Sequence, residues 1–277
     1  MDEAFELLIS PKDLGTVQAE QVDLSFSVEH NRLEHPEDEI ESSWEAALAK
    51  NPRLFNGSKF RLRRVSLVSS TCPPVLTMEL GLTSYKEYLG TNRLSAEKRK
   101  RFEDDGQKHG DKGAHFSNAL GCEAVLCTSD QQMVLLRRSG AVGTHAGLYN
   151  GPSGHPEPKN LGLDDVLPDP SRELSEAVRR ELFQSALDEV VAETGVAVET
   201  LSEPVLMGIM VDSTQKPDAL FFVRTSLDSA SLEVCMEKAQ EAWESDRLVF
   251  WPIAKAAECS LPLTAVTRAA LQCVLEL

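Results

Sequence analysis

Hydrophobic and polar side chains alternate with a two-residue period in several early segments of the chain. Residues 22–28, 59–68 and 75–82 follow this pattern, which predicts β-strands. Apolar side chains recur every four residues between the first two segments, so we expect a helix over about residues 37–50. The packing stripe of this helix consists of Ile40, Trp44 and Leu48.

The later part of the chain shows a different order of elements. Charged and glycine residues dominate residues 95–117, which predicts a mobile crossover or lid between two domains. Beyond it, apolar runs and turn signals predict alternating strands and helices, as in a sheet covered on both faces. We expect a hairpin over 121–139, strands over 205–210, 219–226 and 247–251, and helices near Leu232–Trp243 and at the C-terminus.

A long helix is expected to end at Gly195, where glycine suits the left-handed conformation that follows a last turn. Ser171 is the expected N-cap, because its hydroxyl can accept a hydrogen bond from a free amide of the first turn. The apolar positions that support the helix are Leu182, Leu187, Val190 and Val191.

Two glutamates lie four residues apart on this helix. Glu189 and Glu193 therefore project from the same face, and their oxygens can share one hard cation such as Mg²⁺ or Mn²⁺. A glutamate pair at this spacing is, on its own, more often a solvated helix face. Asp188 is rotated about 100° from Glu189 and is expected to face solvent or a salt-bridge partner.

Composition narrows the classes of partner. A net charge of −16 and a pI near 4.8 argue against binding to nucleic acid or to anionic lipid, so we expect neither partner. The six cysteines form no CxxC pair, and the N-terminus has no signal-peptide pattern. We therefore expect a soluble, intracellular protein, most simply cytoplasmic. The two histidines of the charged stretch, His109 and His115, lack clustered partners in sequence and are not expected to bind a metal.

The sequence around the two glutamates resembles the Nudix hydrolases. Their signature is a glycine, five residues, a glutamate, seven residues and then REUxEExGU, where U is aliphatic. DEVVAETGV, from Asp188 to Val196, matches its end, and GLYNGPSGHPEP resembles the turn that opens it, with Gly154 as the signature glycine. The resemblance implies a Nudix α/β/α sandwich and a metal held by Glu189 and Glu193, which would also be the catalytic residues.

The chain departs from this signature in spacing and in three residues. Gly154 and Glu189 are 35 positions apart where the family has 15, and we expect the excess of 20 to form an exposed inserted loop. The early signature glutamate therefore has no counterpart at fixed spacing, and Glu181 is the nearest carboxylate. Ala192 replaces one glutamate of the EE pair, so Glu244 is a candidate to complete the metal shell. The remaining departures are Ser153 for a glycine and Asp188 for the arginine.

A narrower resemblance covers nearly the whole chain. LFNGSKFRL, LGLTSYKEYLGTN, LLRRS, GHPEP and ELFQSALDEV are similar to the UDP-glucose pyrophosphatase branch of the family and its plant relatives. This branch implies Mg²⁺-dependent hydrolysis of UDP-glucose, or a related UDP-sugar, to UMP and glucose 1-phosphate. It also implies a substrate-binding set: Phe55, Tyr85, Arg138, Gly143, Asn150, His155 and Glu157.

These roles agree with the chemistry of the side chains. An aromatic ring such as Phe55 or Tyr85 can stack on uracil, although half-buried packing is an equally good interpretation of each. The guanidinium of Arg138 can fork onto pyrophosphate oxygens, and Gly143 allows close backbone approach. The side chains of the remaining three residues suit ribose or sugar hydroxyls.

The expected organisation is an α/β protein of two domains. An α+β domain over residues 1–115 would contribute to substrate binding, and residues 116–277 would form the Nudix hydrolase domain. Two alternatives remain beside a UDP-sugar hydrolase. One is a Nudix enzyme for another nucleoside diphosphate derivative such as ADP-ribose, and the other is a nucleotide-binding module with weakened catalysis, which Ala192 favours.

Overall fold

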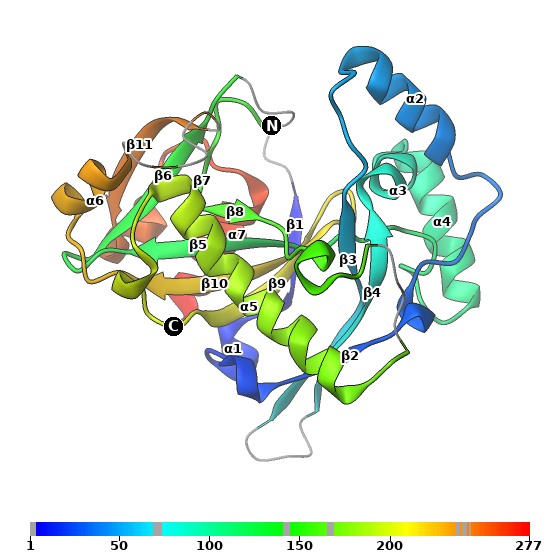
Figure 1. Cartoon of the computed structure of the whole chain (residues 1–277), viewed down its shortest axis with the longest axis horizontal. Coiled ribbons are helices and arrows are strands. Elements are labelled where there is room, and N and C mark those ends of the chain that lie inside the picture. The colour runs from blue at the N-terminus through cyan, green and yellow to red at the C-terminus, as the bar shows by residue number, and fades with distance from the viewer. Residues whose placement is uncertain are drawn as a thin grey trace.

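Two β-sheets organise the computed structural model, which describes residues 4–68, 74–140, 145–164, 169–236, 239, 243 and 245–277 (Figure 1). Within these residues the larger sheet is mixed, with β10 parallel to β5 and its other pairs antiparallel. Its main order is β1 (Phe5–Ile9), β9 (Val205–Asp212), β10 (Pro217–Arg224), β5 (Gly121–Cys127), β6 (Gln132–Arg138) and β11 (Ser245–Pro252). Two short strands join it, as β7 (Tyr149–Asn150) pairs with β6 and β8 (Ser153–Gly154) with β5.

Helices cover both faces of the larger sheet. The long helix α5 (Arg172–Thr194) packs on one face, where Leu182 and Val190 join the apolar core with β5 residues such as Ala124. On the other face α7 (Ala265–Glu276) packs on a second apolar cluster. The predicted α/β sandwich is therefore confirmed. The short helices beside this sheet are α1 (Pro11–Leu14) and α6 (Ser229–Cys235).

The ends of α5 lie where the sequence predicted them. The Ser171 hydroxyl accepts a hydrogen bond from the amide of Leu174 at 3.1 Å. Gly195 has φ +68°, and its amide donates to the carbonyl of Val191. Because α5 begins at Arg172, the segment RELSE forms its first turns, so the inserted loop is shorter than expected at its C-terminal side.

The smaller sheet carries the N-terminal part of the molecule. Its order is β2 (Val22–Phe26), β4 (Val75–Ser84) and β3 (Ser58–Val68), with β4 parallel to β2 and antiparallel to β3. Three helices accompany it: α2 (Ile40–Lys50), α3 (Tyr85–Gly90) and α4 (Ala96–Lys108). The first strand of the chain, β1, does not join this sheet but pairs with β9 in the larger one. The domain division at residue 115 stays a proposal.

The prediction of a mobile crossover over residues 95–117 is wrong for its first half. Residues 96–108 form α4, whose N-cap Ser95 accepts a hydrogen bond from the amide of Lys98. Phe102 is fully buried against Phe116, while the charged residues cover the exposed side of the helix. The N-cap and the buried Phe102 thus support a helix whose composition resembles a linker.

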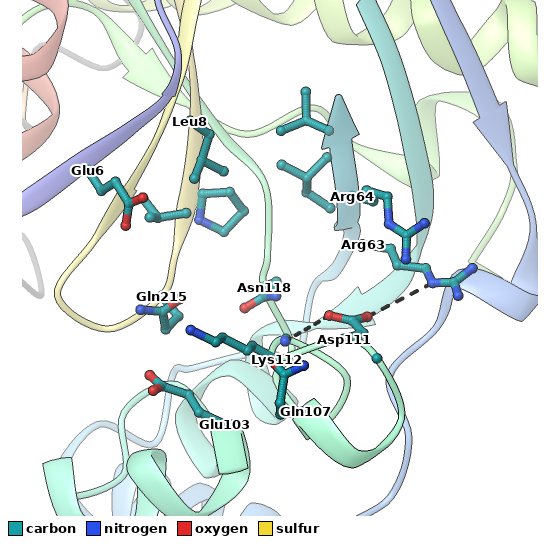
Figure 2. A pocket seen from close by; sticks show the side chains of 16 residues that line it. Glu6, Leu8, Arg63, Arg64, Glu103, Gln107, Asp111, Lys112, Asn118 and Gln215 are labelled. Carbon is teal, nitrogen blue, oxygen red and sulfur yellow. Dashed lines mark hydrogen bonds and ion pairs between the residues drawn. The ribbon is translucent and has the colours of Figure 1, made fainter. Parts of the chain in front are cut away.

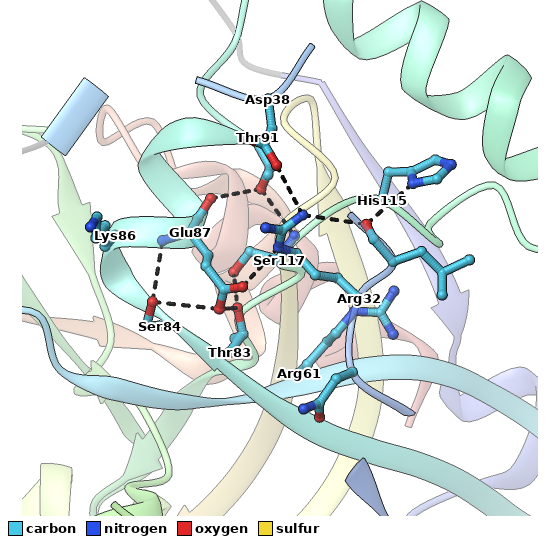
Figure 3. Close-up of polar contacts among 12 residues, drawn as sticks. Arg32, Asp38, Arg61, Thr83, Ser84, Lys86, Glu87, Thr91, His115 and Ser117 are labelled. Atoms are coloured by element: carbon cyan, nitrogen blue, oxygen red, sulfur yellow. Dashed lines mark hydrogen bonds and ion pairs between the residues drawn. The ribbon is translucent and has the colours of Figure 1, made fainter. Parts of the chain in front are cut away.

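Polar side chains hold α3 in place beside the smaller sheet (Figure 3). Glu87 is the centre of this network, because its carboxylate accepts hydrogen bonds from Arg32 Nε at 2.7 Å and from the Thr83 hydroxyl at 3.0 Å. The hydroxyl of Ser84 caps the helix by accepting from the Glu87 amide. These contacts fix the backbone that carries Tyr85.

Candidate active site

The site begins where the turn after β7 meets the last turns of α5. Gly154 lies so close to Glu189 that a Cβ on the glycine would sit 1.9 Å from Glu189 Oε1. One residue earlier, the amide of Ser153 donates a hydrogen bond to Glu193 Oε1 at 2.8 Å. The turn and both carboxylates are therefore in direct contact, although 35 residues separate Gly154 from Glu189. The glycine is required here because any side chain would displace the carboxylate.

A third glutamate fastens the next part of the chain to the same helix. Glu181 Oε1 accepts hydrogen bonds from the amide of Glu157 and from the side chain of Asn160, both at 2.9 Å. The Glu181 residue is 8% exposed, and both hydrogen bonds are partly buried. Glu181 thus holds the segment that follows the GHPEP turn.

The two residues that depart from the signature on this helix differ in their surroundings. Asp188 is exposed and accepts a hydrogen bond from Gln184 at 2.8 Å, so it points away from the Gly154 turn as predicted. Ala192 is half-buried and offers no metal ligand. Glu244, the candidate for completing the shell, lies outside the described residues, as does Gly143.

His155 lies between basic side chains from two other parts of the chain. Burial, together with the charges of Lys216 and Lys59, holds the pKa of the His155 imidazole well below its ordinary value. The ring is therefore neutral near pH 7 and can both donate and accept a hydrogen bond. Lys59, on β3, forms an ion pair with Glu157, which connects the smaller sheet to the turn.

Lys216 belongs to a second ion pair that lies against β5. Its Nζ is 2.6 Å from Asp218 Oδ1, and both side chains are largely buried. A Cβ on Gly121 would be 1.9 Å from that Asp218 oxygen and 2.4 Å from Lys216 Nζ. The glycine at the start of this apolar strand is thus explained by the ion pair that covers it.

The N-terminal part contributes the two aromatic residues of the expected substrate set. Phe55 is 77% exposed, which leaves its ring available for stacking. Tyr85 is half-buried at the start of α3, where its ring packs edge-on against Trp44 at 6.4 Å and beside Tyr88 at 6.3 Å. The two aromatic residues therefore differ, since Tyr85 has a packing role and Phe55 has little contact.

Arg138 and Asn150 lie on neighbouring strands, because β6 pairs with β7 at Leu136 and Asn150. Arg138 is half-buried at the end of β6. Asn150 is 2% exposed, and its Nδ2 donates to the Ser153 hydroxyl at 2.8 Å. Asn150 is thereby attached to the turn that holds Glu193.

Sequence reasoning missed Glu123, which lies at the centre of β5 opposite Ser153 of β8. The side chain is 2% exposed, and burial raises the pKa of its carboxyl to about 8. The signal was present in the sequence, because GCEAVLC places one carboxylate within an otherwise apolar strand.

A separate cavity of about 550 Å³ opens between the two sheets, on the side of β1 and β3 (Figure 2). Its polar lining includes Arg63, Lys112 and Gln215. The described residues of the expected substrate set do not line it.

The histidines of the N-terminal part are closer together than their sequence suggested. The His115 ring is 4.8 Å from that of His35 and 5.7 Å from that of His109. Within the described ranges, no group of three or more histidine, cysteine or acidic residues is arranged to hold a metal ion. The helices in those ranges include none with the length and apolarity of a membrane span.

Comparison with known proteins places this arrangement in a family. The chain is 37% identical over 249 residues to the uridine diphosphate glucose pyrophosphatase NUDT22 of Mus musculus, a match that covers 88% of this chain and 80% of that protein. It is 35% identical over 256 residues to the Homo sapiens protein of the same name, covering 90% and 84% of the two chains. Nudix hydrolase 9 of Arabidopsis thaliana is 34% identical over 260 residues, with coverage of 88% and 81%.

Family models and solved structures add less than these sequence relatives. No family model matches the chain. Among solved structures, the MutT protein from Methanosarcina mazei Go1 matches 56% of this chain and 91% of its own, with 20% identity and a TM-score of 0.36.

The chain belongs to the Nudix hydrolase family, as the extent and identity of the sequence relatives show. It is therefore a hydrolase, and the resemblance stated from the sequence is confirmed. Members of this family generally use a divalent metal.

Proposed function

We propose that the protein hydrolyses the pyrophosphate bond of UDP-glucose or a related UDP-sugar, giving UMP and the sugar 1-phosphate. The observation that carries this proposal is the contact of Glu189 and Glu193 with the Gly154 turn, which supplies the family's carboxylate pair at one place. The names of the mammalian relatives support the choice of substrate. In the reaction, a water oxygen forms a new bond to phosphorus while the bond to the bridging oxygen breaks.

The residues at the turn fit a divalent cation, for which we propose Mg²⁺, with Mn²⁺ as a substitute. Glu189 and Glu193 would hold it, because both offer carboxylate oxygens from one helix face and hard cations prefer such ligands. Because Gly154 has no side chain, the Glu189 carboxylate lies where a Cβ of residue 154 would otherwise be. When bound, the cation would neutralise charge on the pyrophosphate and orient a water molecule.

The protein's own side chains would bind and orient the two ends of the substrate. The guanidinium of Arg138 suits the pyrophosphate oxygens, and the exposed ring of Phe55 suits stacking on uracil. Tyr85 would border the base from α3. The sugar or ribose hydroxyls would meet Asn150 and the neutral imidazole of His155.

Glu157 would act together with Lys59 in this scheme. The Lys59–Glu157 ion pair as a whole has no net charge, so it repels the substrate's phosphates less than a lone carboxylate would. The carboxylate oxygens of Glu157 can still accept hydrogen bonds from hydroxyls. The backbone of Glu157 is held by Glu181, so its position relative to α5 is fixed before substrate binds.

A screen of nucleoside diphosphate derivatives with product identification tests the proposal. We expect purified protein to release UMP and glucose 1-phosphate from UDP-glucose, to stop when a chelator is added, and to recover with Mg²⁺ or Mn²⁺. Preferred turnover of ADP-ribose or a dinucleotide would establish the second Nudix activity instead. Tight binding of UDP-glucose with no turnover of any substrate would establish a binding module.

Glu193→Gln tests the role of the carboxylate pair. The amide oxygen of glutamine can still accept the hydrogen bond from Ser153, so the melting temperature should change little while turnover is lost. Asp188→Asn is the matched control, because that carboxylate is exposed on another side of the same helix. Turnover by Glu193→Gln equal to that of the control would remove Glu193 from the mechanism.

A further inference from the structure

One buried carboxyl beside the turn has no role in the scheme above. Glu123 lies on β5 between Cys122 and Ala124, which join the apolar core on the α5 face of the sheet. Because neighbouring side chains of a strand point to opposite faces, Glu123 projects to the α7 face. The surroundings of Glu123 agree with this direction. Hydrogen bonding by the Thr267 hydroxyl of α7 and by the Gly151 amide opposes the rise that burial causes in the pKa of the Glu123 carboxyl.

The carboxyl is buried with part of its hydrogen-bonding capacity unused. Glu123 is 2% exposed, and its Oε1 has no hydrogen-bond partner among the described residues. The Oδ1 of Asn150, also in a residue 2% exposed, lacks one as well. Gly151 follows Asn150, and a Cβ on Gly151 would lie 3.3 Å from Glu123 Oε1. Two unsatisfied acceptor oxygens are thus buried next to the same short turn, which is costly for a fold unless a donor reaches them.

The neighbours of Glu123 are residues proposed to bind substrate. Arg138 is near enough for its charge to act on the Glu123 carboxyl, and so is Asp218. Asp218 is paired with Lys216, whose charge in turn acts on His155. Glu123 therefore lies close to two of the proposed binding residues, Arg138 and Asn150, on the face of the sheet opposite α5.

We propose that Glu123 is a substrate-binding residue that hydrogen-bonds a donor group, N–H or O–H, of the nucleotide sugar and thereby contributes to substrate selection. This inference rests on the proposed function and adds a recognition contact to the same site. It gives the buried oxygen a partner and explains why a carboxyl interrupts an apolar strand. Nucleotide sugars offer the required donor in two places, at N3–H of uracil and at the hydroxyls of the hexose.

The protonation state of Glu123 suits such a contact. Since burial raises its pKa to about 8, the group is mainly the neutral acid at pH 7 and does not repel the substrate's phosphates. A neutral carboxyl can accept one hydrogen bond and donate another, as can the amide of glutamine. Replacement by glutamine therefore preserves the contact in shape, whereas leucine removes it.

The test compares Glu123→Leu and Glu123→Gln with wild type on UDP-glucose, CDP-glucose and UDP-xylose. We expect Glu123→Leu to lower kcat/KM for UDP-glucose by about 10- to 100-fold and Glu123→Gln to lower it much less. If the donor is uracil N3–H, the preference for UDP-glucose over CDP-glucose should fall in Glu123→Leu. If the donor is the sugar's 6-hydroxyl, the preference for UDP-glucose over UDP-xylose should fall instead.

Glu79→Gln serves as the matched control, because Glu79 is a partly buried carboxylate on β4 that pairs with Arg63 away from the turn. The same kcat/KM for Glu123→Leu and Glu79→Gln on all three substrates would overturn the inference. The affinity for UDP-glucose, measured by calorimetry in the presence of a chelator, distinguishes failure of the Glu123 contact from failure of the proposed function. Wild type that binds but does not hydrolyse UDP-glucose would sink the function alone, whereas an affinity unaffected by Glu123→Leu would sink the contact.

Discussion

The close approach of Gly154 to Glu189 allows a one-methyl test of the carboxylate pair. In Gly154→Ala, the added Cβ would lie 1.9 Å from Glu189 Oε1, 2.2 Å from Cδ and 2.7 Å from Oε2. Real Cβ atoms do not approach other atoms below 3.0 Å, so something must move. Gly154 does not have a positive φ, and an alanine there is unstrained by its own backbone. The carboxylate end of Glu189 is the flexible partner and should retreat.

The size of the effect follows from that displacement. Moving from 1.9 Å to 3.0 Å requires Glu189 Oε1 to shift by about 1 Å, and a misplacement of this size can cost about 100-fold in rate. This factor corresponds to about 2.7 kcal/mol of lost transition-state stabilisation. The melting temperature should change little, because only the end of one side chain has to adjust.

The assay is release of products from the best substrate of the screen, measured across a titration of Mg²⁺. Gly140→Ala is the matched control, because a Cβ there meets no atom of the described residues within 4 Å. We expect Gly154→Ala to lower kcat and to require more Mg²⁺, and Gly140→Ala to behave as wild type. Wild-type kcat and metal requirement in Gly154→Ala would refute the argument that the position of Glu189 matters for catalysis.

Three further predictions concern binding, stability and pH. Tyr85→Ala should raise KM for UDP-glucose with little change in kcat, as steady-state kinetics would show; an unchanged KM would reduce Tyr85 to a packing partner of Trp44. Arg61 is fully buried and donates to three carbonyls, those of His30, Gly113 and Phe116, so Arg61→Met should lower the free energy of unfolding by about 3 kcal/mol in denaturant titrations. The Glu123 carboxyl keeps its proton in the folded state up to about pH 8 but releases it near 4.5 when unfolded, so wild type loses stability as pH rises between these values. Glu123→Gln should therefore gain melting temperature relative to wild type over that range, and a constant difference would contradict the raised pKa.

The helix that carries the carboxylate pair was predictable because its signals are local. Ser171, Gly195 and the apolar positions between them each act within one or two turns, and all three kinds of signal point to the same boundaries. The spacing of Glu189 and Glu193 then fixes their common face without knowledge of the rest of the fold. Their meeting with the Gly154 turn was expected only from the family resemblance, because a 35-residue separation carries no local signal.

Features that depend on distant partners were missed for the same reason. β1 contains only five residues, and its strand character comes from pairing with β9. α4 has the composition of a linker and becomes a helix through its cap and the burial of Phe102. Glu123 could have been flagged as an unusual residue in an apolar strand, but its neighbours Asn150 and Asp218 come from other strands.

The pairing of β1 with β9 has a consequence for how the protein folds while it is being synthesised on the ribosome. Its opening strand emerges first, yet the strand that completes its ladder is made about 200 residues later. During that interval the strands of the small sheet, which lie within residues 22–84, can already pair with one another, but their apolar core is shared with α5, which is made later. The nascent chain should therefore keep β1 unpaired until β9 has been made, by which time α5 and its pair of glutamates are already present.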